Sequence, residues 1–178
     1  TLTSGFARAT SLVAERATLR AFAAAVQDSD AVHIAAHAFS GSRDASLSLI
    51  ALAQEQDDAG VLYLQDIEAL RLHHRPLVVL AGCETGAFGG GNGSIRSLAH
   101  AFLGAGSRAV LATLWNVRDD RTSEFTKNFY RNLADGATFP AALREAQLAA
   151  IRSQEDFDWA AFQLHVGVAG KSPVRTSH

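Results

Sequence analysis

The 178-residue chain is long enough for one domain with a substantial apolar core. Apolar residues make up 48% of it and charged residues 19%, a composition that excludes a disordered chain. A net charge of −2 excludes the basic surface that nucleic acid or an anionic membrane would require, and no apolar run approaches the ~20 residues of a membrane span.

The sequence contains one cysteine, Cys83, so no disulfide can form within the chain. A reducing compartment, the cytoplasm, is therefore expected. The chain begins with Thr1 and contains no methionine, and we expect it to be a piece of a longer protein. Residues 169–178 are predicted to form a disordered tail.

The spacing of apolar residues and the positions of glycine and proline predict an alternation of helices and short strands. In chain order these are a helix over 7–27, a strand over 31–37, a β-hairpin of 46–53 and 61–64, a helix over 65–72, a strand over 77–82, a helix over 94–103, a strand over 108–115, helices over 121–134 and 141–152, and a strand over 159–168. This order indicates an α/β fold in which helices cover both faces of a mostly parallel sheet.

Two reactive side chains stand at the carboxyl ends of predicted strands, where the active sites of α/β sheets usually lie. His37 ends one strand, and Cys83 follows another. If the two strands are parallel neighbours, the imidazole can take the thiol proton and leave a nucleophilic thiolate. The other interpretation is a buried, inert cysteine and a hydrogen-bonded loop histidine.

Metal and nucleotide chemistry find little support. His33 and His37 have the spacing of a helical zinc motif, but Ile34 stands where that motif has glutamate and the segment is predicted as a strand. No metal is expected, and His33 is interpreted as a hydrogen-bonded core residue. The glycine-rich segment 89–93 lacks the lysine of a phosphate-binding loop, so no cofactor is expected. Residues 84–93 are predicted to form a mobile loop that borders the substrate cleft.

Several segments, in this order, resemble the CHAT domain family of caspase-like cysteine peptidases. They are HIAAH at 33–37, LAGCET at 80–85, SLAHAFLGAG at 97–106, TLWNV at 113–117, the pair Phe129-Tyr130 and WAAF at 159–162. We assign residues 1–168 to this domain and expect an N-terminal part of the family domain to be missing. The resemblance implies a caspase-like fold, with the hairpin between the His and Cys strands, in a larger bacterial protein in which helical repeats precede the domain.

The resemblance also implies catalytic roles. His37 would be the general base and Cys83 the nucleophile, and the backbone N–H groups of Ala38 and Cys83 would hold the oxyanion. The family usually has glycine after the histidine; alanine keeps the N–H but tolerates fewer backbone angles.

The candidate substrate-binding residues are Trp115, Glu84 and Asp119. Trp115 has two interpretations, as a sheet-end core aromatic or as a wall of the cleft. Asp119 and Asp120 are interpreted either as helix-capping residues or, in the case of Asp119, as the carboxylate that selects a basic substrate side chain.

Two functions fit these residues. The first is a cysteine endopeptidase that cleaves a protein substrate after Arg or Lys, without a metal or an organic cofactor. The second is a catalytically dormant caspase-like domain that binds a partner protein, an interpretation that Ala38 favours. Beyond a protein substrate, the expected partners are a helical-repeat region or a partner protein of the full-length chain, with neither nucleic acid nor membrane among them.

Overall fold

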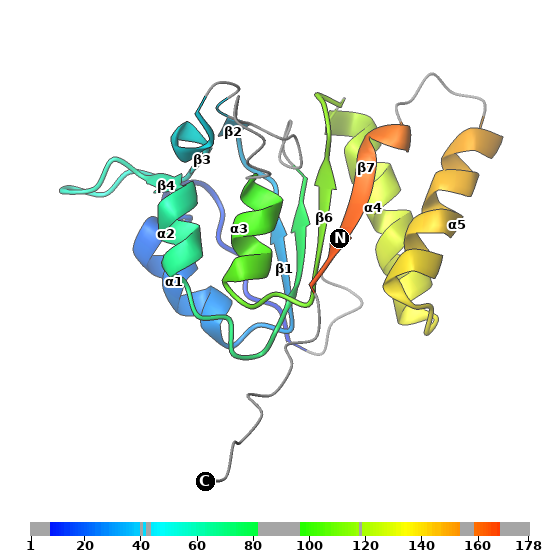
Figure 1. The fold of residues 1–178 in the computed structure, drawn as a ribbon, viewed down its shortest axis with the longest axis horizontal. Helices are drawn as coiled ribbons and strands as arrows, with labels where there is room; N and C mark the ends of the chain where they lie inside the picture. Colours follow the sequence, from blue (N-terminus) through cyan, green and yellow to red (C-terminus); the bar gives the residue numbers. More distant parts are fainter. Residues whose placement is uncertain are drawn as a thin grey trace, which may run out of the picture.

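The computed structural model describes residues 8–39, 41, 44–81, 97–117, 119–153 and 159–167 (Figure 1). A four-stranded main sheet forms its centre, and a three-stranded small sheet continues from the carboxyl end of the first strand. Across these residues we find no helix with the length and apolar character needed to cross a membrane.

The main sheet has the strand order β1-β5-β6-β7. Its strands are β1 (Ala31–Ile34), β5 (Leu77–Leu80), β6 (Ala109–Thr113) and β7 (Phe162–Val166). The first three are parallel and β7 is antiparallel to β6. Every residue of β5 and β6 is buried, as expected for apolar central strands covered on both faces. The predicted α/β class with a mostly parallel sheet is confirmed.

Helices lie on both sides of the main sheet (Figure 1). One side carries α1 (Leu19–Gln27), α2 (Leu64–Ala69) and α3 (Leu98–Gly104), and the other carries α4 (Asp119–Ala134) and α5 (Phe139–Arg152). Successive side chains of a strand point to opposite faces. In β5, Val78 and Leu80 therefore pack with the first group of helices, and Leu77 and Val79 pack with the second.

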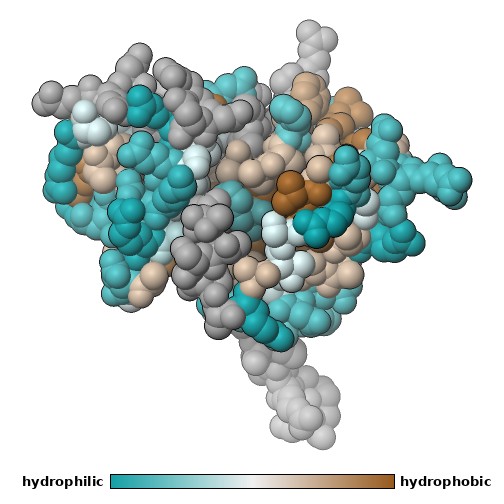
Figure 2. Space-filling view, turned by 180° about the vertical axis from the view of Figure 1, so that it is seen from behind, coloured by the Kyte–Doolittle hydropathy of each residue, from teal (hydrophilic) through white to brown (hydrophobic). Residues whose placement is uncertain are grey.

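The small sheet is formed by the chain between β1 and β5. Its strands β2 (Ala38–Phe39), β3 (Leu49–Ala51) and β4 (Val61–Tyr63) pair antiparallel in that order, and the 3₁₀ turn η3 (Ala45–Leu47) precedes β3. Gly60 precedes β4 with a φ of +70°, and a Cβ there would lie 2.6 Å from the Ala53 carbonyl oxygen, so only glycine fits without strain. Seen from behind, apolar residues gather on the half of the molecule that carries this sheet and α1 (Figure 2).

The helix predicted over 7–27 is wrong in its first half. α1 begins at Leu19, and before it the described chain has only the 3₁₀ turn η2 (Ala14–Arg16). The reason is a tertiary contact: Ala53 N donates to Ala17 O at 2.9 Å, which aligns the preceding segment with residue 53. The Thr18 hydroxyl then accepts from Ala21 N and caps α1.

Several predicted strands also have different limits. The first hairpin strand, predicted over 46–53, is only β3 (Leu49–Ala51), because the 3₁₀ turn η3 occupies its start, and β6 ends at Thr113 rather than at residue 115. β1 ends at Ile34 rather than at residue 37, because the chain leaves the main sheet there and enters the small sheet at residue 38. The last strand starts at Phe162, after the 3₁₀ turn η4 (Trp159–Ala161). The other helices begin and end within a few residues of their predicted bounds.

A substitution of Phe129 on α4 would test the packing of α4 against β5 and β6. Its side chain has 0% exposure and packs in the cluster with Leu77 and Leu111. We expect Phe129→Ala to lower the free energy of unfolding by about 3–5 kcal/mol, because it removes buried apolar area and leaves a cavity. Urea unfolding measures this, with Phe39→Ala as the control, since Phe39 is 59% exposed. Equal losses in the two variants would contradict the packing described.

Candidate active site

The carboxyl ends of β1 and β5 lie side by side in the main sheet. The two strands are parallel and in register, with Ile34 opposite Leu80, and Ala81 N donates to Ile34 O at 2.8 Å. His37 and Cys83 each follow this last pair by three residues. β1 and β5 therefore end at the same level of the main sheet. Cys83, Glu84 and the predicted loop 84–93 lie outside the described residues.

His37 stands at the junction of the two sheets. Its side chain is exposed, while its carbonyl oxygen accepts a hydrogen bond from Ala51 N at 2.8 Å. This bond fixes the backbone of His37 against β3, and the next residue already belongs to β2. An exposed imidazole on an anchored backbone can take up and deliver a proton at a defined place.

Ala38 pairs with Ile50 across the small sheet. The bond from Ala51 N to His37 O places this pair between two hydrogen-bonded rungs of the antiparallel ladder. The N–H of Ala38 therefore points away from β3. Ala38 is not among the described non-glycine residues with positive φ, which are Ala14 and Arg75. Alanine thus fits this backbone without the strain that would call for glycine.

His33 is a half-buried residue with a hydrogen-bond partner, whereas the sequence predicted a hydrogen-bonded core residue. It lies on the α4 side of β1, where its Nδ1 is 3.1 Å from the Tyr130 hydroxyl and the two ring centroids are 5.8 Å apart. Burial lowers the pKa of His33 and raises that of Tyr130. The part of the chain that the structure describes contains no group of three or more potential metal ligands.

Two of the candidate binding residues, Trp115 and Asp119, lie beyond the carboxyl end of β6. Trp115 follows this strand by two residues and is 39% exposed. Leu114 N donates to Ala161 O at 3.0 Å, which prolongs the pairing of β6 with the segment before β7 and holds the chain next to Trp115. Asp119 and Asp120 are the first two residues of α4, so both lie within its first turn, where a negative charge is favoured.

A histidine pair that sequence reasoning missed lies between α3 and β7. The His100 and His165 rings meet edge to face with centroids 5.4 Å apart, and His100 Nδ1 is 2.9 Å from the Ser97 hydroxyl. Burial and then the nearby His100 lower the pKa of His165, whose Nε2 is buried without a hydrogen-bond partner among the described residues. No local pattern signals this pair, because 64 residues separate its members along the chain.

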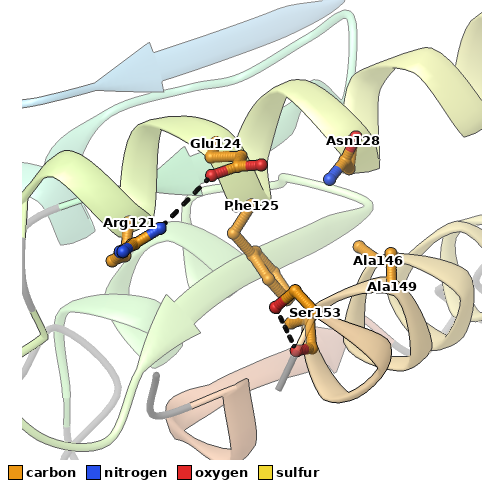
Figure 3. A pocket seen from close by; sticks show the side chains of 8 residues that line it. Arg121, Glu124, Phe125, Asn128, Ala146, Ala149 and Ser153 are labelled. Atoms are coloured by element: carbon orange, nitrogen blue, oxygen red, sulfur yellow. Dashed lines mark hydrogen bonds and ion pairs between the residues drawn. The ribbon is translucent and has the colours of Figure 1, made fainter. Parts of the chain in front are cut away.

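A shallow pocket lies between α4 and α5 (Figure 3). Phe125 reaches from α4 toward Ser153, and its ring stacks on Phe162 with centroids 4.0 Å apart. At the rim, Arg121 Nη1 lies 3.8 Å from a carboxylate oxygen of Glu124, one turn along the same helix. The described lining includes none of the site residues predicted from the sequence, and the pocket is a seam between two packed helices.

The half-buried His33 predicts a pH dependence of stability. Its folded pKa lies below the unfolded value of 6.5, so below about pH 6.5 the unfolded chain binds a proton that the folded chain does not. The free energy of unfolding should therefore fall as the pH drops from 6.5 to 5, by up to about 1.4 kcal/mol per pH unit for each such histidine. His33→Gln should flatten this slope, measured by urea unfolding across pH, and the exposed His73→Gln should keep it. An unchanged slope in His33→Gln would contradict the assignment.

Comparison with protein families agrees with this geometry. The CHAT domain model matches residues 1–168. A search of curated proteins found no match to the chain. The match covers the main sheet, the small sheet and all five helices described above, with both His37 and Cys83 inside it. The chain belongs to the CHAT domain family, a caspase-like peptidase family.

Proposed function

We propose that the chain is a cysteine endopeptidase in which His37 and Cys83 form the catalytic dyad. The observation that supports this proposal is the register of β1 and β5, which ends both strands at the Ile34–Leu80 pair; His37 and Cys83 each follow that pair by three residues in the sequence. Family membership supports it independently.

In the proposed reaction, His37 takes the thiol proton, and the thiolate of Cys83 attacks the carbonyl carbon of the scissile bond. The tetrahedral oxyanion collapses, the C–N bond breaks, and His37 gives its proton to the leaving amine. Water then hydrolyses the thioester and releases the second product. The sequence of steps uses only these two side chains, backbone N–H groups and water.

The oxyanion would be held by the backbone N–H groups of Ala38 and Cys83. The direction of the Ala38 N–H, away from β3, supports this role, because the ladder of the small sheet does not consume it. The extended backbone at residue 38 also suits alanine as well as glycine. Its N–H can therefore serve in the way that a glycine N–H would.

Substrate selection is proposed to depend on the segment after β6. Asp119 would pair with the Arg or Lys side chain before the scissile bond, Trp115 would form an apolar wall, and Glu84 would add a second carboxylate. The exposure of Trp115 supports a wall rather than a core role, and the position of Asp119 at the start of α4 places it on the carboxyl side of β6. A desolvated cation requires such a carboxylate partner.

The alternative function is a dormant caspase-like domain that binds a protein partner. Its support is the departure from glycine at Ala38, and the unstrained backbone there weakens it. Alkylation of Cys83 with iodoacetamide separates the two functions. A poised thiolate reacts well below pH 8, whereas an inert buried thiol does not.

The dyad predicts loss of cleavage in two single variants. Cys83→Ala and His37→Ala should each lower kcat/KM at least about a thousandfold, and the double variant should be no worse, because the two groups act as one unit. Cleavage of a peptide library followed by mass spectrometry measures this, with the exposed His73→Ala as control and thermal unfolding as the test of folding. Near-normal cleavage by His37→Ala would refute the dyad.

The proposed role of Asp119 predicts that the enzyme prefers Arg or Lys before the scissile bond. In a fluorogenic panel with Arg, Lys, Asp or Leu before the scissile bond, we expect Arg and Lys to be preferred. Asp119→Ala should lower kcat/KM for Arg roughly 100-fold, since it leaves a desolvated cation unpaired. The neighbouring Asp120→Ala is the matched control and should keep the preference. A preference for Asp, or a persistent Arg preference in Asp119→Ala, would exclude this role.

A further inference from the structure

The small sheet has one face turned toward the core and one turned outward. The core face carries Ile50 and Leu62, which are 1% and 4% exposed. Ala38, which pairs with Ile50, lies on the same face and packs against the core. The residues next to these three in sequence point the other way, because side chains alternate along a strand. We define the outward face by the residues of this second set: His37, Phe39, Leu49, Ala51, Val61 and Tyr63.

The strand register arranges the outward face in two rows. Phe39 pairs with Leu49, and Leu49 pairs with Tyr63, which forms one row across all three strands. The other row contains Ala51, paired with Val61 and hydrogen-bonded through its N–H to the carbonyl of His37. The general base of the proposed reaction therefore stands at the corner of a face that is otherwise formed by apolar and aromatic side chains.

Two aromatic side chains of the outward face are exposed. Phe39 is 59% and Tyr63 39% exposed, while Leu49 and Val61 between and beside them are half-buried. Aromatic side chains held on paired strands lose little further freedom when a ligand covers them, which favours binding.

We propose that the outward face binds the part of the substrate that follows the scissile bond, and that it selects apolar side chains, aliphatic or aromatic, at the first positions of that segment. This inference rests on the proposed endopeptidase function. The substrate would then need apolar residues after the scissile bond as well as Arg or Lys before it.

The position of His37 on the outward face is the reason for proposing the leaving segment of the substrate as the ligand of this face. His37 gives its proton to the amine nitrogen with which the leaving segment begins, so this segment must start next to the imidazole. Phe39 follows His37 by two residues of extended chain, roughly 7 Å at about 3.3 Å per residue, and points to the same face. A peptide that runs from His37 across this face would pass Phe39 first, then Leu49 and Tyr63 in the same row.

A pair of internally quenched peptides tests this inference. Both carry the same acyl side, ending in the residue that the fluorogenic panel prefers, and they differ after the scissile bond, with Leu-Phe in one and Ser-Gly in the other. We expect wild-type kcat/KM to be about tenfold higher for the Leu-Phe peptide, and Phe39→Ser to remove most of this ratio. Val166→Ser is the matched control, because Val166 is 60% exposed on strand β7 of the main sheet, and it should keep the ratio.

The outcomes separate this inference from the proposed function. Cleavage of both peptides at equal rates, abolished by Cys83→Ala, would overturn the selectivity of the outward face and leave the endopeptidase in place. Cleavage of neither peptide, nor of any library peptide, would overturn both. A concentration-dependent dimer that Phe39→Ser dissociates, seen by sedimentation together with an unchanged ratio, would assign the face to a second copy of the chain instead.

Discussion

The in-register parallel pairing of β1 with β5 is the constraint on which the candidate site depends. Side chains alternate along a strand, so a slip of one residue would turn every side chain of β1 to the opposite face. Ile34 would then leave the α1–α3 side, and His33 would leave Tyr130 on α4. The buried contacts on both faces therefore hold one register. That register ends β1 and β5 at the same level, with His37 and Cys83 each three positions further along the sequence.

The second constraint is the passage of the chain from the main sheet to the small sheet. Within four residues, the carbonyl of Ile34 accepts from Ala81, which directly follows β5, and the carbonyl of His37 accepts from Ala51 on β3. The backbone of His37 is thereby held between two sheets, while its side chain stays exposed. A loop histidine without these bonds would have no fixed position, and general base catalysis requires one.

The proposed oxyanion hole and leaving-side surface follow from this same junction. Ala38 lies between hydrogen-bonded rungs, so its N–H points away from β3, and Phe39 points to the same face as His37. The acyl side of the substrate would instead face the segment after β6, where Trp115 and the start of α4 lie. One short stretch of chain, residues 37–39, would thus supply the base, an oxyanion donor and a binding side chain.

Local patterns in the sequence predicted the central strands of the main sheet and the candidate dyad. The apolar runs of β5 and β6 identified central strands covered on both faces, and the position of a histidine and the single cysteine beyond two strands predicted the dyad. The hydrogen bond expected for His33 is present, although the residue is only half-buried. The tertiary structure decided what depends on partners distant along the chain: the start of α1, set by the bond between Ala53 and Ala17, the end of β1 at Ile34, and the contact of His100 with His165. It also decided that the outward face of the small sheet is shared by His37 and Phe39, because the direction of those side chains follows from pairing with β3, which no periodicity in residues 31–39 reveals.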